Sequence, residues 1–487
     1  MTAFRLSENI DKNKVFLVNK SQIEKRLDPF YYVPELMELE EKVWQKNPQK
    51  LIHYAKAVSS GATPKTTESE KYYSDKENGI PFLRVQNLTS AGRLKLDNVK
   101  FINEETHNGM LARSKVKEGD LLIKITGVGR MAVSSVAPED FEGNVNQHMV
   151  VMKTDSPETS KVLAAFLNSD IGEKLASRRA TGGTRPALDY PALLSIPIIH
   201  DKRILKITEA AVKKKEVKEQ QAKDLLASVD DYLLGELGIT LPEKNRRLEK
   251  RIFTVNYSDA TGKRWDSYYH QAFFTDTLTA VQAGKFNCRK LSETIEGHLV
   301  KGRLPNAKEK EGPCRVVQIN SINNDGTIDT DELLTAKNIF TKDQQLLEND
   351  ILVVITGATI GKIAFWNMEG EYFLGGDIVK FQTATSIDPY YVFNYLLSPP
   401  AQIQIKRNVT GATNGHLAPI DVKNILIPLP PYQKQIEIAD HIRQVREQAN
   451  QLQQEAEKEL EQASREVEGL ILDKNALTHK TTDHVKP

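Results

Sequence analysis

The stretch Pro430–Leu472 decides the fold, because its spacing of apolar residues predicts one long helix that needs a partner. It reads PPYQKQIEIADHIRQVREQANQLQQEAEKELEQASREVEGLIL. Its small and apolar residues recur at alternating steps of three and four, apart from one four-four step at Leu460. This spacing is typical of a coiled-coil seam with a stutter-like offset. The seam consists of Ile438, Ile442, Val445, Ala449, Leu452, Ala456, Leu460, Ala463, Val467 and Leu470.

A second stretch, Asp201–Leu237, supplies a candidate partner for this helix. The two prolines that open the first stretch suit a helix start, since the first helical amides lack partners anyway. That helix would be roughly 60 Å long at 1.5 Å per residue. In the second stretch the first residue is an N-cap candidate, and Gly235, Gly238 and Pro242 are expected to stop the helix. Its apolar positions are Ile204, Ile207, Ala211, Val217, Leu225, Leu226, Val229 and Leu233.

Opposite charges lie in the middle of the two stretches, so the helices attract each other in either direction. The first helix carries Lys213, Lys214, Lys215 and Lys218, and the distal helix carries Glu455, Glu457, Glu459 and Glu461. Ends-matched pairing brings these clusters together whether the helices run parallel or antiparallel, so charge leaves the direction open. The alternative is two separate solvated helices, each packed on its own domain.

Length and composition set the broad class. At 487 residues the chain is long enough for two or three domains, and 39% hydrophobic with 27% charged residues is typical of a globular protein. A net charge of +1 provides no global basic field, so DNA binding would need local patches or basic partner subunits. Only two cysteines occur, Cys288 and Cys314, which predicts a reducing cytoplasm without a disulfide scaffold or cysteine zinc site. We expect no membrane partner, because no signal-like or membrane-spanning apolar run occurs.

An internal repeat covers most of the chain. Ordered matches run through both halves at offsets from 229 (Phe166 with Tyr395) to 241 (Gly61 with Gly302). They pair Val15–Asn19 with Ile252–Asn256, Arg26–Asp28 with Arg264–Asp266, Lys50-Leu51 with Lys290-Leu291, Gly61…Pro64 with Gly302…Pro305, Val85-Gln86 with Val317-Gln318, Gly119–Gly127 with Asn349–Gly357, Phe166–Ser169 with Tyr395–Ser398, Thr181-Gly182 and Thr184 with Thr410-Gly411 and Thr413, and Ile196-Pro197 with Ile427-Pro428.

The repeat predicts an α+β fold in which each copy is a mixed domain followed by a long helix. Short β-branched runs such as Leu121–Thr126 and Ile351–Thr356 read as strands, and Pro157–Arg179 and Asp388–Lys406 read as helical. Two similar copies that pack on each other generate approximate two-fold symmetry, and a two-fold axis through a helix pair makes it antiparallel. The sequence thus predicts an antiparallel coiled coil between tandem domains; a linear tandem with a flexible hinge is the alternative.

The motifs argue against catalysis by this chain. Gly127-Val-Gly129 follows a strand but runs into another strand, so a hairpin turn fits better than a cofactor loop. No phosphate-binding P-loop pattern occurs, and Leu429-Pro-Pro-Tyr432 lacks the acid or amide of an amino-methyltransferase tetrapeptide. The histidines His148, His270 and His416 lack a second ligand at metal spacing, so no metal site is expected.

Polar side chains at matching places of the two copies are candidates for contacts with nucleic acid. Arginine reads guanine bidentately, and glutamine and asparagine read adenine. The strand-to-loop stretches supply Arg84, Gln86 and Asn87 in the first copy and Arg315, Gln318 and Asn320 in the second. A cross-strand polar edge is the alternative interpretation.

Glycine-rich turns form a second candidate group, because backbone amides and hydroxyls can hold phosphate. They supply Thr181, Thr184 and Arg185 in one copy and Thr410, Thr413, Asn414 and His416 in the other. Arg130 and Lys362 follow the Thr-Gly turns and would neutralise phosphate, unless they are solvated loop cations. The turns could also be purely structural. Arg26-x-Asp28 and Arg264-x-Asp266 are intradomain ion pairs or partner contacts.

In combination these features resemble the specificity subunit of Type I restriction–modification systems, HsdS, over about residues 13–472. The resemblance rests on the Arg-x-Asp…Tyr-Tyr entries, the Asp…Ile-Thr-Gly stretches, the Thr-Gly loops and Pro430–Gln435, where Lys434 replaces a frequent glutamate. The first copy departs further, with Ile198–Asp201 in place of the prolines. The implied organisation is a target recognition domain at 13–200, a central helix at 201–238, a charged linker at 239–250, a second target recognition domain at 251–429, a distal helix at 430–472 and a polar tail at 473–487.

The resemblance implies a non-catalytic cytoplasmic subunit that reads a bipartite site on double-stranded DNA. Two methyltransferase subunits would bind around the helices and hold S-adenosylmethionine, and restriction subunits would add ATP- and Mg²⁺-dependent cleavage. No cofactor is expected on this chain. The alternatives are an enzyme half, a methyltransferase or nuclease whose catalytic motif has drifted, and a scaffold for protein partners only.

Overall fold

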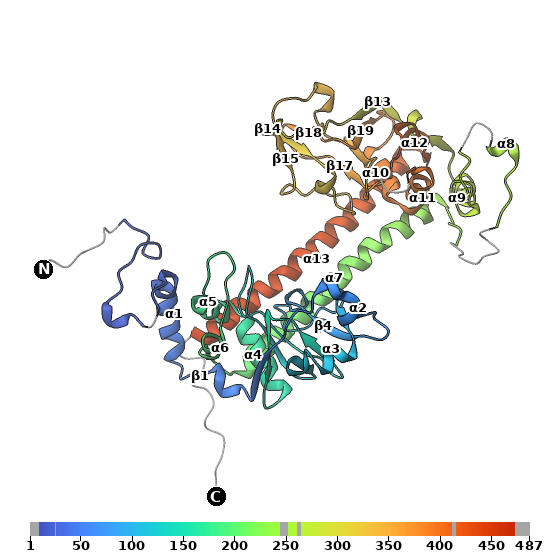
Figure 1. Cartoon of the computed structure of the whole chain (residues 1–487). Helices are drawn as coiled ribbons and strands as arrows, with labels where there is room; N and C mark the ends of the chain where they lie inside the picture. The colour runs from blue at the N-terminus through green and yellow to red at the C-terminus, as the bar shows by residue number, and fades with distance from the viewer. Residues whose placement is uncertain (1–8, 25, 244–251, 261–263, 412–414, 473–487) are drawn as a thin grey trace, which may run out of the picture. The chain divides into compact units, whose positions relative to one another are not determined.

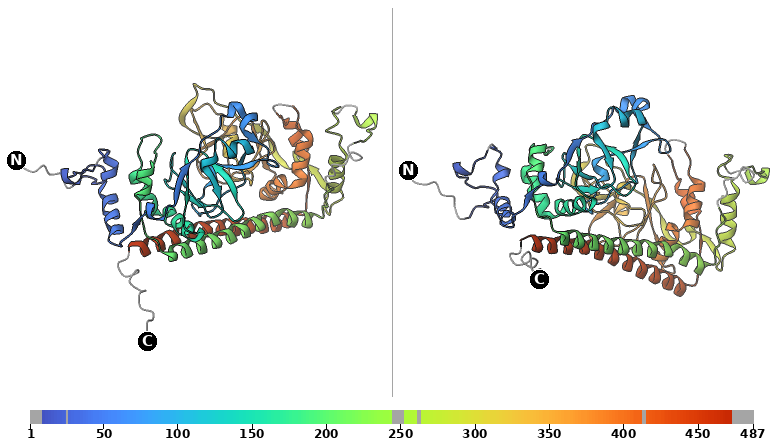
Figure 2. Two further views of the ribbon diagram at one scale, coloured as in Figure 1. Left: turned by 60° about the horizontal axis from the view of Figure 1, so that its bottom comes forward. Right: turned by 90° about the horizontal axis from the view of Figure 1, so that it is seen from below.

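The computed structural model describes residues 9–24, 26–243, 252–260, 264–411 and 415–472. It divides into two compact units: unit 1 comprises residues 1–219 and 453–487, and unit 2 comprises residues 220–452 (Figures 1 and 2). Most of the predicted linker and the whole predicted tail lie outside the described residues. Within the described part, no helix combines the length and the hydrophobicity needed to cross a membrane.

Unit 1 is built on two main sheets. The first is fully antiparallel, and the second contains one parallel pair, β4 with β9. The first has the order β2 (Ala57–Ser60), β10 (Met149–Lys153), β7 (Leu121–Lys124), β8 (Ser134–Val136), the second the order β3 (Tyr73–Ser74), β5 (Lys100–Ile102), β4 (Ile80–Leu83), β9 (Glu142–Val145), β6 (Lys115–Lys117), and a small pair joins β1 (Gln49–Lys50) to β11 (Pro197–Ile198).

Helices α1, α4, α5 and α6 and the start of α7 pack on the first sheet in one core. The core contains Leu121 and Ile123 of β7 together with Phe166 and Leu175, all fully or almost fully buried. Burying side chains of this size contributes about 1.5–3 kcal/mol each. The helices are α1 (Pro34–Trp44), α2 (Ser69–Tyr72), α3 (Glu104–Asn108), α4 (Pro157–Asn168), α5 (Asp170–Arg179), α6 (Tyr190–Leu194) and the first half of α7 (Lys202–Leu237).

Unit 2 repeats this plan. Its first sheet has the order β13 (Ile295–Lys301), β19 (Ile378–Thr383), β16 (Ile351–Val354), β17 (Ile363–Phe365), its second the order β15 (Leu334–Ala336), β14 (Lys310–Val317), β18 (Tyr372–Leu374), with β14 and β18 parallel, and β12 (Cys288–Lys290) pairs with β20 (Leu426–Pro428). Its helices are α8 (Tyr257–Ala260), α9 (Ala272–Gln282), α10 (Pro389–Leu397), α11 (Pro399–Asn408), α12 (Pro419–Lys423) and the first part of α13 (Tyr432–Leu472).

The internal repeat and the α+β class are therefore confirmed, with one difference in the helices. Each stretch predicted as a single helical piece consists of two helices that meet at a serine, Ser169 in unit 1 and Ser398 in unit 2. Ser169 Oγ accepts a hydrogen bond from the Gly172 amide and so caps the second helix. In unit 2 a proline occupies the first position of the second helix instead.

Within unit 1, α7 and α13 run antiparallel. Ile204 near the start of α7 shares a core with Val467 and Ile471 near the end of α13. Further along α7, Lys218 Nζ lies 3.2 Å from Glu455 and 3.0 Å from Glu459. Lys214 Nζ lies 3.3 Å from the same Glu459 carboxylate. The predicted meeting of the lysine and glutamate clusters is confirmed.

Within unit 2 the same two helices are again antiparallel. Lys434 Nζ at the start of α13 lies 2.9 Å from Glu236 at the end of α7. One turn or two further, the His441 and Tyr232 rings contact each other with centroids 3.9 Å apart and an interplanar angle of 35°. The views of Figures 1 and 2 agree that α7 and α13 lie side by side.

Three details of the helix predictions are corrected or sharpened. Val217, one of the predicted apolar positions of this helix, is 49% exposed, and the neighbouring Lys218 reaches the glutamates of α13 instead. Gly235 lies inside α7, and the helix ends at Leu237, where Gly238 with φ +67° supplies the left-handed conformation. Asp201 is the N-cap, since its side chain accepts a hydrogen bond from the Arg203 amide at 2.8 Å.

Candidate nucleic-acid interface

In unit 1 the Thr-Gly turn after β7 is joined to the glycine-rich loop 181–187. Ala187 forms isolated bridges with both Thr126 and Thr181. The Gly127 amide also donates to the carbonyl of Pro186 at 3.0 Å. The bonds hold the base of the loop, while Thr184 and Arg185 at its tip are exposed.

Unit 2 builds the same junction with different side chains. His416 forms isolated bridges with Thr356 and Thr410, and the Gly357 amide donates to Gly415 at 3.1 Å. The His416 ring adds a contact of its own, with Nδ1 3.3 Å from Thr356 Oγ1. The predicted site residues Thr413 and Asn414 lie outside the described residues. The hydroxyls of Thr181 and Thr410 bond within their own loops, to the carbonyls of Ala187 and His416.

An arginine anchors each junction from behind. Arg26 donates to the carbonyls of Arg179 (2.7 Å) and Ala180 (3.1 Å), where α5 runs into the loop. Arg264 donates to the carbonyls of Arg407 (3.4 Å) and Val409 (3.1 Å) at the same place in unit 2. Each guanidinium is also paired with the aspartate two residues later, at 2.8 and 2.6 Å. The Arg-x-Asp motifs are thus intradomain ion pairs that fix the loop.

A second arginine supports the first. Arg178 lies 4.1 Å from the Tyr31 ring centroid and donates to the Tyr31 carbonyl at 2.7 Å. Arg407 and Tyr269 have the same two contacts, at 4.1 and 3.0 Å. The loops are therefore carried by a repeated arginine–tyrosine framework in both units.

In unit 1 a carboxylate joins this framework. Glu40 on α1 is 9% exposed and accepts hydrogen bonds from both Arg178 and Arg179. Burial alone would raise the pKa of Glu40, but the hydrogen bond and charge of Arg179, then the charge of Arg178, outweigh it and lower the pKa. In unit 2, burial lowers the pKa of Arg407.

The turn after β4 buries one of the residues predicted to contact bases, Asn87, and exposes another, Gln86. Asn87 is 1% exposed; its Oδ1 accepts from the Arg84 amide at 2.9 Å and its Nδ2 donates to the Lys95 carbonyl at 2.9 Å. The Asn87 amide is thus used within the turn, which favours a structural role over the predicted base contact. The Arg84 guanidinium bonds the Asn98 carbonyl at 3.1 Å. Gln86 is the exposed residue of this turn.

The equivalent turn in unit 2 lies two residues from the sequence match. Gln318, not Arg315, occupies the position of Arg84. Its backbone amide donates to Ser321 Oγ. Its side chain donates to the carbonyl of Glu332, 14 residues later, as the Arg84 side chain donates to Asn98, 14 residues later. Asn320 is therefore the counterpart of Gln86, and it is exposed too. Arg315 lies on β14, exposed, 3.3 Å from the Tyr372 hydroxyl.

The Ile-Pro match is displaced in the same way. The Leu51 amide donates to the Ile196 carbonyl, and the equivalent Leu291 amide donates to Ile425 rather than to Ile427. Lys50 in β1 and Lys290 in β12 are equivalent, as the repeat predicts: Lys50 pairs with Pro197, and Lys290 pairs with Leu426. The two Ile-Pro dipeptides are therefore a coincidence of composition within otherwise equivalent strands.

The two cations predicted to neutralise phosphate are engaged inside their units. Arg130 pairs with Asp170 at 2.8 Å and donates to the Asn168 carbonyl at 2.9 Å. Lys362 is half-buried and donates to the Ile322 carbonyl at 2.7 Å. The two cations do not occupy equivalent positions. The carbonyl of Lys362 accepts from the Val354 amide, and the carbonyl of Val133 accepts from the equivalent Lys124 amide, so Lys362 corresponds to Val133. Both cations hold loops in place.

Sequence reasoning missed a buried lysine beneath the first loop. Lys124 is 5% exposed, and its ammonium donates to the carbonyls of Val128 (2.6 Å) and Arg130 (2.9 Å). Burial lowers the pKa of Lys124. The loop tip, Val128, is 79% exposed. A lysine inside an apolar strand run was the available signal; its counterpart in unit 2 is Val354.

The turn Asn146–His148 connects the two groups of candidates. The Asn146 amide donates to Leu83, just before the Arg84 turn, and the His148 carbonyl accepts from Ile125, just before the Thr-Gly turn. Gln147 between them is exposed and bonds Thr63. The strand ends, the turn and the loop thus form one continuous edge of unit 1. No repeat signal marked Gln147, since unit 2 has Gly376 there.

A family model for the Type I restriction modification DNA specificity domain matches residues 285–462. This part of the chain is similar to the DNA specificity domain of that family. The match covers β12 to β20 of unit 2 and most of α13, and the same order of motifs and elements recurs in unit 1.

Solved structures with low sequence identity are similar over nearly their whole length. One comes from a study of complex assembly and conformational transition of the type I R-M system (14% identity, 88% of this chain and 97% of that chain, TM-score 0.49). Others are the S subunit from M. genitalium (13%, 87% and 95%, TM-score 0.37) and HsdS from Thermoanaerobacter tengcongensis (14%, 88% and 96%, TM-score 0.35). No curated protein sequence matches this chain.

Proposed function

We propose that each unit of this DNA specificity protein reads one half of a split target on double-stranded DNA. The observation that carries the proposal is a shared loop framework with different exposed side chains. Arg26 and Arg264 anchor the loops at the equivalent place, while exposed side chains differ, as Gln86 does from Asn320. A common scaffold with variable tips is what independent readout of two sequences requires.

The exposed side chains provide the chemistry for this readout. Gln86 and Asn320 can each bond the N6 and N7 edge of adenine, and Arg185 and Arg315 can bond guanine. Thr184 and the loop amides can hold phosphate. With a net charge of +1, the chain leaves much of the phosphate neutralisation to its partners.

We propose further that the chain has no catalytic activity and directs partner subunits to the site. Two methyltransferase subunits would hold S-adenosylmethionine, and restriction subunits would use ATP and Mg²⁺ for cleavage. Supporting this, the sequence lacks the P-loop and the complete methyltransferase tetrapeptide. The test is labelled S-adenosylmethionine with target DNA: we expect methyl transfer only when the methyltransferase subunit is added, and robust turnover by the chain alone would contradict the proposal.

A further inference from the structure

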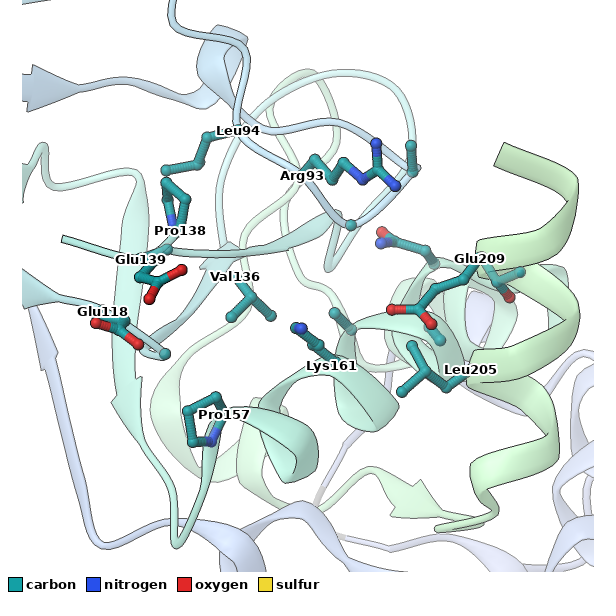
Figure 3. Close-up of a pocket in the computed structure, with 18 of the residues that line it drawn as sticks. Arg93, Leu94, Glu118, Val136, Pro138, Glu139, Pro157, Lys161, Leu205 and Glu209 are labelled. Carbon is teal, nitrogen blue, oxygen red and sulfur yellow. The ribbon is translucent and has the colours of Figure 1, made fainter. Parts of the chain in front are cut away.

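A cavity of about 610 Å³ lies in unit 1, at a place where unit 2 holds three aromatic rings that contact one another. It lies between the turn 91–96, the end of β8, helix α4 and the first two turns of α7 (Figure 3). Its apolar wall includes Leu94, Val136, Ala164 and Leu205, and charged groups rim it. None of the proposed DNA-contacting residues lines it.

The hydrogen bonds identify the equivalent place in unit 2. The Val136 amide donates to the Gly92 carbonyl in unit 1, and the Phe365 amide donates to the Gly326 carbonyl in unit 2. Gly92 faces Ala164 across the cavity, and Gly326 faces Phe393. Phe365 therefore stands for Val136, and Phe393 stands for Ala164. Counting back one turn from Phe393 and Ala164, Tyr390 stands for Lys161.

Unit 2 fills this place with its own aromatic side chains. The rings of Phe365, Tyr390 and Phe393 contact one another with centroids 5.2–5.4 Å apart. Two guanidiniums cover them, Arg443 at 4.6 Å from the Tyr390 centroid and Arg446 at 5.6 Å from the Phe393 centroid. In unit 1, Val136 and Ala164 are smaller than Phe365 and Phe393 and leave the space open. Lys161 occupies the position of Tyr390, the third ring.

The charge around the cavity of unit 1 is acidic. Three carboxylates line it, Glu118, Glu139 and Glu209, against the single ammonium of Lys161. The remaining cation, Arg93, is already paired with Glu216 at 2.6 Å. An occupant that carries positive charge beside its apolar group would therefore complement the rim, as Arg443 and Arg446 complement the rings in unit 2.

We propose that this cavity docks a protein partner through an aromatic side chain flanked by lysine or arginine. The partner would supply from outside the ring-and-guanidinium pair that unit 2 builds from its own residues. Burial of an aromatic anchor in a preformed pocket is a common source of interface affinity. The inference rests on the proposed function for the identity of the partner, the methyltransferase subunit.

The test is to build the unit 2 arrangement in unit 1. Lys161→Tyr with Ala164→Phe should close the cavity while the chain keeps its thermal midpoint, and should weaken binding of the purified methyltransferase subunit at least tenfold by isothermal titration calorimetry. Glu209→Arg, which keeps the cavity open and reverses one rim charge, should weaken it as well. Lys42→Phe, which adds a ring on exposed α1, is the matched control and should bind like wild type.

Three results separate the possible outcomes. If both cavity variants fold and bind the methyltransferase subunit as tightly as wild type, the inference is wrong. If wild type itself does not bind that subunit, the proposed function fails instead. If sedimentation shows that wild type self-associates and that Ala164→Phe abolishes this, a second copy of the chain occupies the cavity and the inference is overturned.

Discussion

Arg26 Nη1 donates to the carbonyl of Arg179 at 2.7 Å, across 153 residues of sequence. The bond ties the Arg-x-Asp motif to the end of α5, the point at which the chain enters the exposed loop of unit 1. Arg264 repeats the relationship in unit 2 through the carbonyls of Arg407 and Val409. The internal repeat thus keeps the support of this loop in both units.

Replacing this anchor should affect one half-site only. Arg26→Ala removes two charge-assisted hydrogen bonds and an ion pair, so we expect unit 1 to lose about 1–3 kcal/mol of unfolding free energy. Methylation should become permissive at the half-site that unit 1 reads. Arg264→Ala is the control and should relax the other half-site. Methylome sequencing of the two variant strains checks this, and relaxation of both half-sites by either variant would speak against separate loop supports.

Neighbouring residues of the turn after β4 should give opposite phenotypes. Gln86→Ala should leave stability unchanged and cost about 1–3 kcal/mol of discrimination at one base pair, because Gln86 is exposed. Asn87→Ala should instead destabilise unit 1 by about 1–3 kcal/mol, because the buried Arg84 amide and Lys95 carbonyl lose their partner. Urea unfolding and binding titrations measure the two quantities. Equal loss of binding to all sequences in Gln86→Ala would mean a phosphate contact.

The sequence predicted the repeat, the helix pair and the meeting of lysines with glutamates, because these depend on periodicity and charge. It misplaced Arg84 against Arg315, because the dipeptide Val-Gln occurs twice by coincidence. The turn is defined instead by an acceptor side chain three residues after its cap, Asn87 in one unit and Ser321 in the other. A single sequence does not distinguish such an acceptor from an exposed base contact.

Side-chain partners that are distant in the sequence could not be predicted from it either. Arg130 looked like a free cation after a glycine turn, but Asp170 and Asn168 lie next to it only in the folded unit. Val217 fits the helical spacing of apolar residues but is exposed. Its neighbour Lys218 lies toward the other helix, where its ammonium pairs with two carboxylates. Side-chain pairing over long sequence separations decided each of these cases.

The buried Glu40 should make unit 1 sensitive to acid. Its pKa is lowered in the folded state, so its stabilising contribution is present above the unfolded pKa of about 4.3 and is lost as the pH falls through the folded pKa. Glu40→Gln should cost about 3 kcal/mol at pH 7, because two buried guanidiniums lose their carboxylate. It should also flatten the decline of stability below about pH 5.

The matched control is Glu38→Gln, an exposed residue of the same helix. Thermal unfolding followed from pH 7 to pH 3 makes the comparison. If Glu40→Gln and wild type lose stability in parallel as the pH falls, the ion pair does not govern the acid sensitivity of unit 1.

The paired helices provide a separate prediction about the gap between half-sites. Four residues add roughly 6 Å of helix, against about 3.4 Å per base pair along DNA. Matched four-residue insertions after Val217 in α7 and after Glu457 in α13 should lengthen the preferred spacer by one or two base pairs and leave the half-site sequences unchanged. Two-residue insertions should destabilise the pair, because they rotate the seam. An unchanged spacer with stable four-residue insertions would show that the helices do not set the separation.

The central claim, that each unit reads its own half of the target, is tested most directly by an exchange within unit 1. Residues 60–200 are replaced by the corresponding segment of a relative, and the methylome of a strain that carries the hybrid with its methyltransferase subunit is sequenced. We expect a new sequence at one half-site, with the other half-site and the spacer unchanged. A change in both half-sites, with the hybrid folded and active, would contradict the central claim.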